Sequence, residues 1–361
     1  MNDQELKNLT GQVLHNCDIS DAFHAGLYSI CGLALRLRDL YKWEKQLPPW
    51  EERDSSEILD WIEAKETRWE AYAENDYSKL SLFGQQYDAF DTAGINAVLE
   101  PHNLYYGAGY AHSLKPTFFL AEVVQKTRFN GYYIYTLGRE LARDLLTIPA
   151  MSQDDRVFLR QQSANMFLWD KLFYITKSGR PAMNFALENL GITDREPNKL
   201  RQHLPDIFRA VKDSYIYHEL GEIQDTTFDR QIWREMVAAF PFSPVEFIAR
   251  ALKDILADTN AYGTLQYIIA QHQTAGLAFY VAFIDGLVRE FFPEIRSAFE
   301  DFAKSQDWRV IERAVDQGYR NARKNTVLIL DIYRQSIEKD NLKWAEKEIQ
   351  QQVLGKYVGK S

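Results

Sequence analysis

Along most of the chain, apolar residues recur at steps of three and four, which is the spacing of a helix that buries one face. The first predicted helix covers 22–43, with Asp18 or Ser20 as its cap. A second starts near Asp54, where Glu57 completes the spacing of a capping box. The same pattern predicts helices over 84–99, 139–146, 154–176, 181–190, 200–224, 229–240, 244–256, 262–292, 294–303, 307–336 and 341–353.

The period changes between residues 117 and 137. Segments 117–127 and 132–137 are rich in β-formers and are joined around Asn130-Gly131, the strongest short hairpin signal. A helix that ends at this Asn-Gly is the alternative, because glycine is also favoured just past a helix. We favour the hairpin. The predicted fold is therefore mainly α, a multi-helix bundle with one small β-hairpin near 117–137.

The chain has 361 residues, more than a single domain usually contains. The polar stretch 191–198 is the best boundary by composition. It predicts an N-terminal helical domain with the hairpin, 1–190, and a C-terminal helical domain, 199–361. One continuous unit is the alternative.

Charge and cysteine usage narrow the classes of function. Lys plus Arg total 42 against 51 Asp plus Glu, a formal net charge of −9, which argues against nucleic acid as the main partner. Only two cysteines occur, so no disulfide framework is indicated. No signal peptide is recognisable, and the longest apolar stretch, 275–288, is short for a membrane span. We expect a soluble, cytoplasmic protein without a membrane partner.

The stretch 215–225 concentrates chemistry-capable side chains at helical spacing. In a helix, one stripe carries Tyr215, His218, Glu222 and Asp225. Metal sites in helical bundles place His and Glu three or four residues apart, and Glu219 adds a carboxylate partly off the stripe. The second His of the zinc-protease motif is missing. A site for a divalent metal or a shared proton is one interpretation, and a solvated helix face is the other.

A second polar residue stands in apolar surroundings. Asp285 lies in a helix apolar enough to be buried, and a buried carboxylate needs a partner. Arg289, four residues on, would make a structural ion pair. Asp285 would alternatively complete a site with His218 and Glu222, and Asp258 and His272 are weaker candidates for the same role.

The Gly- and Tyr-rich segment 101–112 is predicted to be a loop. It lacks the full dinucleotide and phosphate-loop motifs. A binding edge for a small-molecule ligand is one hypothesis, and a tight connection packed on the hairpin is the other. The candidate ligand-binding residues are Tyr105, Tyr106, Gly107, Gly109, Tyr110 and His112.

The sequences Tyr-His-Glu-Leu-Gly-Glu222 and Tyr-Tyr-Gly-Ala-Gly-Tyr110 resemble those of an uncharacterised family of bacterial proteins. The resemblance implies a match over the full length and brings no activity.

Two classes of function follow. We favour a non-catalytic scaffold or ligand-binding protein, whose contact surfaces are the aromatic loop and a tryptophan cluster at 43–69. The alternative is a metal-binding protein, or a metal-assisted or acid–base enzyme, that uses His218, Glu222 and Asp225 with Glu219 and Asp285. The amphipathic carboxyl end, 319–360, packs on the body or forms a homodimer seam.

Overall fold

The computed structural model describes residues 1–111 and 114–356. The chain divides into two compact units, residues 1–172 and 173–361. The stretch 191–198, which composition marks as a boundary, joins two helices inside the second unit.

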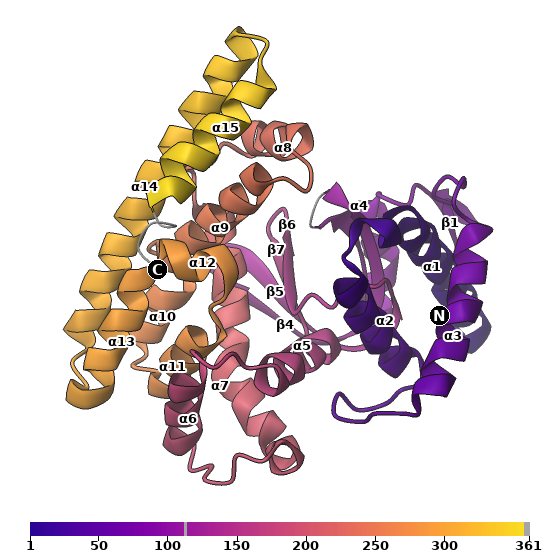
Figure 1. The fold of residues 1–361 in the computed structure, drawn as a ribbon. Helices are drawn as coiled ribbons and strands as arrows, with labels where there is room; N and C mark the ends of the chain where they lie inside the picture. Colours follow the sequence, from indigo (N-terminus) through magenta and orange to yellow (C-terminus); the bar gives the residue numbers. More distant parts are fainter. Residues whose placement is uncertain (112–113, 357–361) are drawn as a thin grey trace. The chain divides into compact units, whose positions relative to one another are not determined.

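The first unit contains a five-stranded sheet with strand order β3-β4-β5-β7-β6, which curls into a half-barrel (Figure 1). Strands β5 and β7 are parallel, and the other neighbours are antiparallel. A separate two-stranded sheet joins β1 and β2. The strands are β1 (Leu80–Leu82), β2 (Gln85–Tyr87), β3 (Leu104–Tyr110), β4 (Pro116–Phe129), β5 (Tyr132–Arg143), β6 (Ala150–Gln153) and β7 (Arg156–Arg160).

The predicted fold class is therefore wrong, although the hairpin itself is confirmed. Asn130 and Gly131 both have positive φ, 48° and 91°, as a tight hairpin turn requires, and Phe129 pairs with Tyr132. The error lies in the strands around the hairpin. Segment 139–143 and segment 156–160 were predicted as helix, and 104–110 as loop, but all three are strands.

Strands β3 and β7 are buried on both faces, so their sequences do not alternate. Residues 104–108 of β3 are all buried. Tyr106 packs with Phe118 in one apolar cluster, and Tyr105 packs with Phe119 in another. A short continuous apolar run of this kind cannot be told from a helix segment by periodicity.

The helices of the first unit differ from the prediction mainly at its amino end. The predicted helix 22–43 contains only the last three residues of a first helix, Asp3–His24, whose earlier part was not predicted. A second helix begins after Ser29, which accepts a hydrogen bond from the Gly32 amide. Asp18 and Ser20 lie buried inside the preceding helix and cap nothing. The α-helices of the unit are α1 (Asp3–His24), α2 (Ile30–Glu44), α3 (Ser55–Glu70), α4 (Thr92–Leu99) and α5 (Gln161–Phe173), which ends one residue into the second unit.

In its described part, the second unit is helical throughout (Figure 1). The predicted helix 262–292 is three helices, with breaks near His272 and Gly286, which have φ values of 50° and 52°. The α-helices of the unit are α6 (Arg180–Asn189), α7 (Pro197–Gln224), α8 (Arg230–Ala239), α9 (Pro244–Thr259), α10 (Thr264–Ala270), α11 (Thr274–Phe283), α12 (Gly286–Phe291), α13 (Pro293–Ser305), α14 (Trp308–Glu338) and α15 (Leu342–Val353).

Candidate functional site

Helices α7 and α9 approach closely because a glycine stands at their contact. A Cβ atom at Gly221 would lie 2.0 Å from the Ala257 carbonyl oxygen, so only glycine fits there without a shift of the helices. The Asn260 side-chain amide donates to the Gly221 carbonyl at 2.9 Å and supports the same contact. Two residues of the stripe predicted on 215–225, His218 and Glu222, therefore contact a second helix.

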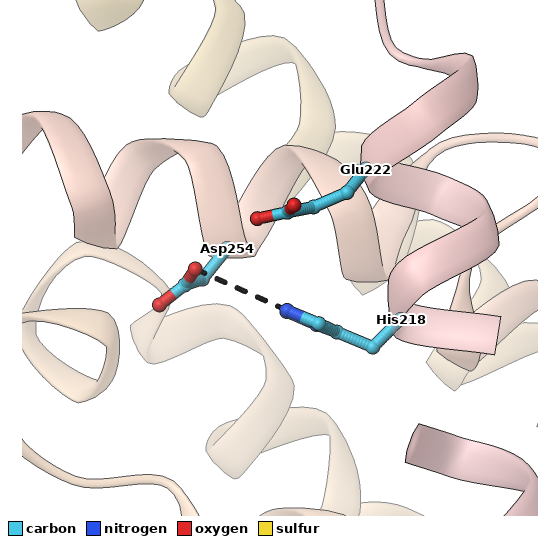
Figure 2. Close-up of side chains that lie close together, drawn as sticks. All are labelled: His218, Glu222 and Asp254. Atoms are coloured by element: carbon cyan, nitrogen blue, oxygen red, sulfur yellow. Dashed lines mark ion pairs between the residues drawn. The ribbon is translucent and has the colours of Figure 1, made fainter. Parts of the chain in front are cut away.

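Each helix contributes a pair of polar side chains spaced by one turn. His218 and Glu222 come from α7, and Asp254 and Asp258 come from α9. Single ligand atoms of His218, Glu222 and Asp254 all lie within 4.8 Å of one another. Figure 2 shows the three side chains pointing toward one another from the two helices. Among the residues that the structure describes, no other three His, Cys, Asp or Glu side chains gather in this way.

Asp258 orients the imidazole of His218. The Nδ1 atom of His218 lies 2.9 Å from Oδ1 of Asp258, and Oδ2 of Asp258 accepts a hydrogen bond from the Tyr280 hydroxyl of α11, also at 2.9 Å. With Nδ1–H directed to Asp258, Nε2 faces Asp254, whose Oδ1 is 4.0 Å away. A carboxylate behind the distal nitrogen is the usual support of a metal-binding histidine.

A lysine reaches the site from α9. The Nζ atom of Lys253 donates to Oε1 of Glu222 at 2.6 Å. The side chains are partly exposed: 30% for His218, 43% for Asp254, 23% for Glu222 and 27% for Lys253. The site therefore combines water access with a defined set of contacts.

The site's electrostatics set the protonation of its members. Burial lowers the pKa of His218, but Asp258 and Asp254 outweigh burial and raise that pKa well above its ordinary value. Burial raises the pKa of Asp254 to about 6, against the charge of His218. Burial also acts to raise the pKa of Glu222, but Lys253 and His218 lower it. Without a metal, His218 is thus a cation near neutral pH.

Several predicted members of the site lie outside the group of three. Asp225 ends α7, accepts from the Thr227 amide at 2.8 Å and is 3.5 Å from the Tyr319 hydroxyl. Glu219 is half-buried on α7. Asp285 is exposed at the start of α12. Tyr215 is half-buried, and burial raises its pKa.

The partners of His218 are residues that sequence reasoning missed or ranked low. Asp258 was a weaker candidate, and Asp254, Lys253 and Tyr280 were not singled out. One signal was available, because Asp254 and Asp258 repeat the spacing of His218 and Glu222 on a second apolar helix.

The predicted ligand-binding loop is strand β3. Tyr105 and Tyr106 are buried, and Tyr106 donates to the Ala89 carbonyl at 2.7 Å. Gly107 lies against the Phe119 ring, which a Cβ atom would meet at 2.1 Å. Tyr110 is 64% exposed and stacks on Phe90. His112 lies outside the described residues.

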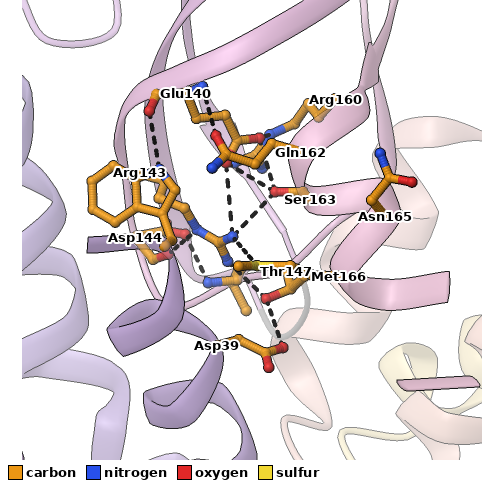
Figure 3. A network of polar contacts seen from close by, with 12 residues as sticks. Asp39, Glu140, Arg143, Asp144, Thr147, Arg160, Gln162, Ser163, Asn165 and Met166 are labelled. Carbon is orange, nitrogen blue, oxygen red and sulfur yellow. Dashed lines mark hydrogen bonds and ion pairs between the residues drawn. The ribbon is translucent and has the colours of Figure 1, made fainter. Parts of the chain in front are cut away.

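The first unit contains a second concentration of charge, which is fully buried (Figure 3). The Glu140 carboxylate accepts from Arg160 Nε and from the Ser163 hydroxyl, both at 2.8 Å, and Arg143 Nη1 is 3.7 Å away. Arg143 also donates to the Thr147 hydroxyl at 2.7 Å. The side chains of Glu140, Arg143 and Arg160 are 0% exposed.

A buried lysine lies in the same unit. The Nζ atom of Lys115 is 3.0 Å from Asp21 and 3.2 Å from Asp144, and it donates to the Ser20 hydroxyl at 2.9 Å. Burial raises the pKa of Asp21 to about 7, against the charge of Lys115. These side chains, and those around Glu140, are buried and pair with one another, and they leave no exposed face for a substrate. Among the described residues, Arg160 Nη2 is buried there without a hydrogen-bond partner.

Two family profiles match the chain along nearly its whole length. The N-terminal domain of a family of unknown function (DUF6866) matches residues 8–160, and the C-terminal domain of the same family matches residues 165–352. The chain belongs to this uncharacterised family. The predicted resemblance to such a family is confirmed.

The C-terminal match contains all members of the His218 site. No curated protein and no solved structure matches the chain. In the described ranges, no helix has the length and apolar character needed to cross a bilayer.

Proposed function

We propose that the protein binds a divalent metal ion through His218, Glu222 and Asp254. The observation that carries the proposal is the orientation of His218 by Asp258, which directs Nε2 toward two carboxylates from two helices. Ligand atoms that share one ion at about 2.0–2.2 Å lie at most about 4.4 Å apart. A separation within 4.8 Å therefore requires only small rotations of partly exposed side chains.

The donor set favours a borderline transition metal. One imidazole nitrogen and two carboxylate oxygens suit Zn²⁺ or Mn²⁺, whereas Mg²⁺ prefers oxygen ligands alone. Three protein ligands leave positions for water or a substrate, as in catalytic zinc sites. A bound ion there would polarise a substrate oxygen or acidify a water molecule. Metal-assisted chemistry is thus the enzymatic form of the proposal.

Direct titration tests the proposal. Protein purified without metal resin and treated with a chelator is titrated with Zn²⁺, Mn²⁺ and Mg²⁺ by calorimetry. We expect one Zn²⁺ or Mn²⁺ ion to bind per chain, and Mg²⁺ to bind more weakly. His218→Ala should weaken binding more than about 100-fold, beyond the usual effect of an outer residue. His203→Ala, four turns earlier on α7, is the matched control and should bind as the parent does.

Two outcomes of the titration would contradict the metal proposal. If the parent binds no ion, or if His218→Ala and His203→Ala bind equally well, the metal proposal fails. The group would then be an ion-pair cluster that joins α7 and α9.

The other predictions about binding and location stay proposals. A ligand edge at Tyr105–Tyr110 has less support, because its first two tyrosines are buried in the sheet. A homodimer seam at the carboxyl end is supported by exposed Val327, Ile337 and Leu342. A reducing, cytoplasmic location is supported by the exposed free thiol of Cys31.

A further inference from the structure

Beside the metal ligands, two cations and a tryptophan form a compact group. Lys253 Nζ lies 4.6 Å from the centre of the Trp233 ring, and the guanidinium carbon of Arg250 lies 5.4 Å from it. Arg250 and Lys253 are three residues apart on α9, and Trp233 comes from α8. Lys253 links this group to the metal ligands through its contact with Glu222.

Two donors of the group have no acceptor. Among the residues that the structure describes, Arg250 Nη2 and Trp233 Nε1 are buried and make no hydrogen bond. The Nε atom of Arg250 donates a hydrogen bond to Oε1 of Glu246 at 2.8 Å. A buried donor without an acceptor is destabilising, because it has lost its hydrogen bond to water. Three donors on one patch, two of them unsatisfied, have the chemistry that recognises an oxyanion.

The balance of charge makes this recognition depend on the metal. Without metal, the cations beside the ligands are Arg250 and Lys253. The carboxylates facing them are Glu222, Glu246, Asp254 and Asp258. The carboxylates outnumber the cations, and one of them holds Lys253. A divalent cation adds two positive charges, which offsets the excess of carboxylates, and it competes with Lys253 for Glu222.

We propose that Lys253, Arg250 and Trp233 form an oxyanion subsite that becomes competent when a divalent ion takes Glu222 from Lys253. The ligand is a small molecule with a phosphate or carboxylate group, held with its charged end between the ion and the released ammonium. This inference rests on the proposed metal function. It adds the class of substrate and an order of binding, in which the metal precedes the anion.

Substitution of Lys253 should change metal affinity and anion affinity in opposite directions, which a simple ion-pair cluster would not do. Lys253→Met removes the cation that competes for Glu222, so we expect Zn²⁺ or Mn²⁺ to bind more tightly, by about tenfold. The same variant should bind the anion about 10- to 100-fold more weakly, because a charge-assisted hydrogen bond is lost. Lys212→Met is the matched control, because Lys212 is a partly exposed lysine of α7 paired with Asp213. It should change neither affinity.

The experiment titrates inorganic phosphate and, separately, acetate into metal-loaded and metal-free protein by calorimetry. We expect the metal-loaded parent to bind phosphate, acetate or both, and the metal-free parent to bind neither. Phosphate alone identifies a phosphorylated substrate, and acetate alone identifies a carboxylate. Trp233→Phe keeps an aromatic ring and removes the Nε1 donor. It should lower the affinity for the anion about tenfold and leave the affinity for metal unchanged.

The outcomes separate this inference from the metal proposal. Metal binding without anion binding overturns the oxyanion subsite and leaves the metal site standing. Anion affinity that survives in Lys253→Met and Trp233→Phe also overturns it. Absence of metal binding in the parent overturns both. Thermal denaturation of each variant, together with Lys253→Arg, which keeps the charge and should bind the anion, shows that a loss reflects chemistry and not misfolding.

Discussion

The main charged cluster of the first unit is fully buried, whereas that of the second unit is partly exposed. In the first, Glu140 and its arginines are 0% exposed, and side chains of the same unit satisfy the carboxylate. In the second, the His218 group is partly exposed, and carboxylates outnumber cations in its surroundings. The first arrangement stabilises one packing of the sheet and its neighbours. The second leaves an excess of acceptor oxygens that a dissolved cation can reach.

The difference shows which polar cluster is a candidate site. A buried charge is tolerated only when it is paired, so a closed network is explained by folding alone. The His218 group includes Asp254, whose pKa is raised to about 6, and this means that its ionised form is disfavoured in the folded chain. A cation would remove that penalty. Function is therefore expected where such a cost lies at a partly exposed group, because the buried Asp21, whose pKa is raised to about 7, is out of reach of a dissolved cation.

Breaking the closed network should give the largest loss of stability. Glu140→Ala leaves two buried guanidinium groups without their carboxylate, and we expect a loss of about 3–5 kcal/mol. Urea unfolding followed by near-UV circular dichroism measures it. Glu122→Ala is the control, because the Glu122–Arg139 pair is exposed and should contribute at most about 1 kcal/mol. If Glu140→Ala and Glu122→Ala lost equal unfolding free energy, the buried network around Glu140 would contribute no more than an exposed ion pair.

The glycine at the helix contact should matter for both stability and metal binding. Gly221→Ala places a Cβ atom 2.0 Å from the Ala257 oxygen, so α7 and α9 must separate. We expect a loss of about 1–3 kcal/mol in unfolding free energy and a loss of metal affinity. Gly11→Ala, on an exposed position of α1 with no atom within 4 Å, is the control and should be neutral or slightly stabilising. Unchanged metal affinity in Gly221→Ala would show that the helix contact does not position the ligands.

The orienting carboxylate should affect the metal more than the fold. Asp258→Asn weakens the hold on the Nδ1 proton of His218, so we expect metal affinity to fall about 10- to 100-fold. Calorimetry measures the affinity, and thermal denaturation checks the fold. Tyr280→Phe removes only the hydroxyl behind Asp258 and should have a smaller effect in the same direction. A larger effect of Tyr280→Phe than of Asp258→Asn would contradict the orienting role.

The smallest expected effect is a gain in stability, in the variant Asp254→Asn. Because the pKa of Asp254 is about 6 in the folded chain and 3.8 ordinarily, its ionisation opposes folding. Stability of the metal-free protein should therefore fall as pH rises from about 4 to 6. Asp254→Asn should remove that fall, and its melting temperature at pH 7 should exceed the parent's. The side chain is 43% exposed, so water screens part of the effect.

The same variant sharpens the comparison between the units. Asp254→Asn should bind metal poorly while it folds more stably, whereas Glu140→Ala should only lose stability. His218 adds to the acid preference, because its pKa is raised in the folded chain. The stability it contributes is present below its ordinary pKa and is lost as pH rises through the raised value. Melting temperatures of the parent, Asp254→Asn and His218→Ala, measured from about pH 4 to 8, separate the two contributions.

Local patterns in the chain were enough to predict a helix or a turn wherever one physical rule dominated. Helical spacing gave α7, α8, α9 and the carboxyl-terminal helices to within a few residues, because each buries a single face. Asn130-Gly131 gave the hairpin, because positive φ at both positions admits few residues. The spacing of His218 and Glu222 gave one half of the candidate site.

The remaining strands and the second half of the site depend on packing between segments that are distant in the chain. Strands β3 and β7 are covered on both faces, so their residues carry no alternation from which a strand can be predicted. The second half of the site, Asp254 and Asp258, comes from a helix whose own pattern does not say what it faces. The contact at Gly221 selects those partners, since it sets which turns of α7 and α9 meet. Periodicity shows that a helix has a polar stripe, but packing decides whether that stripe meets water or another helix.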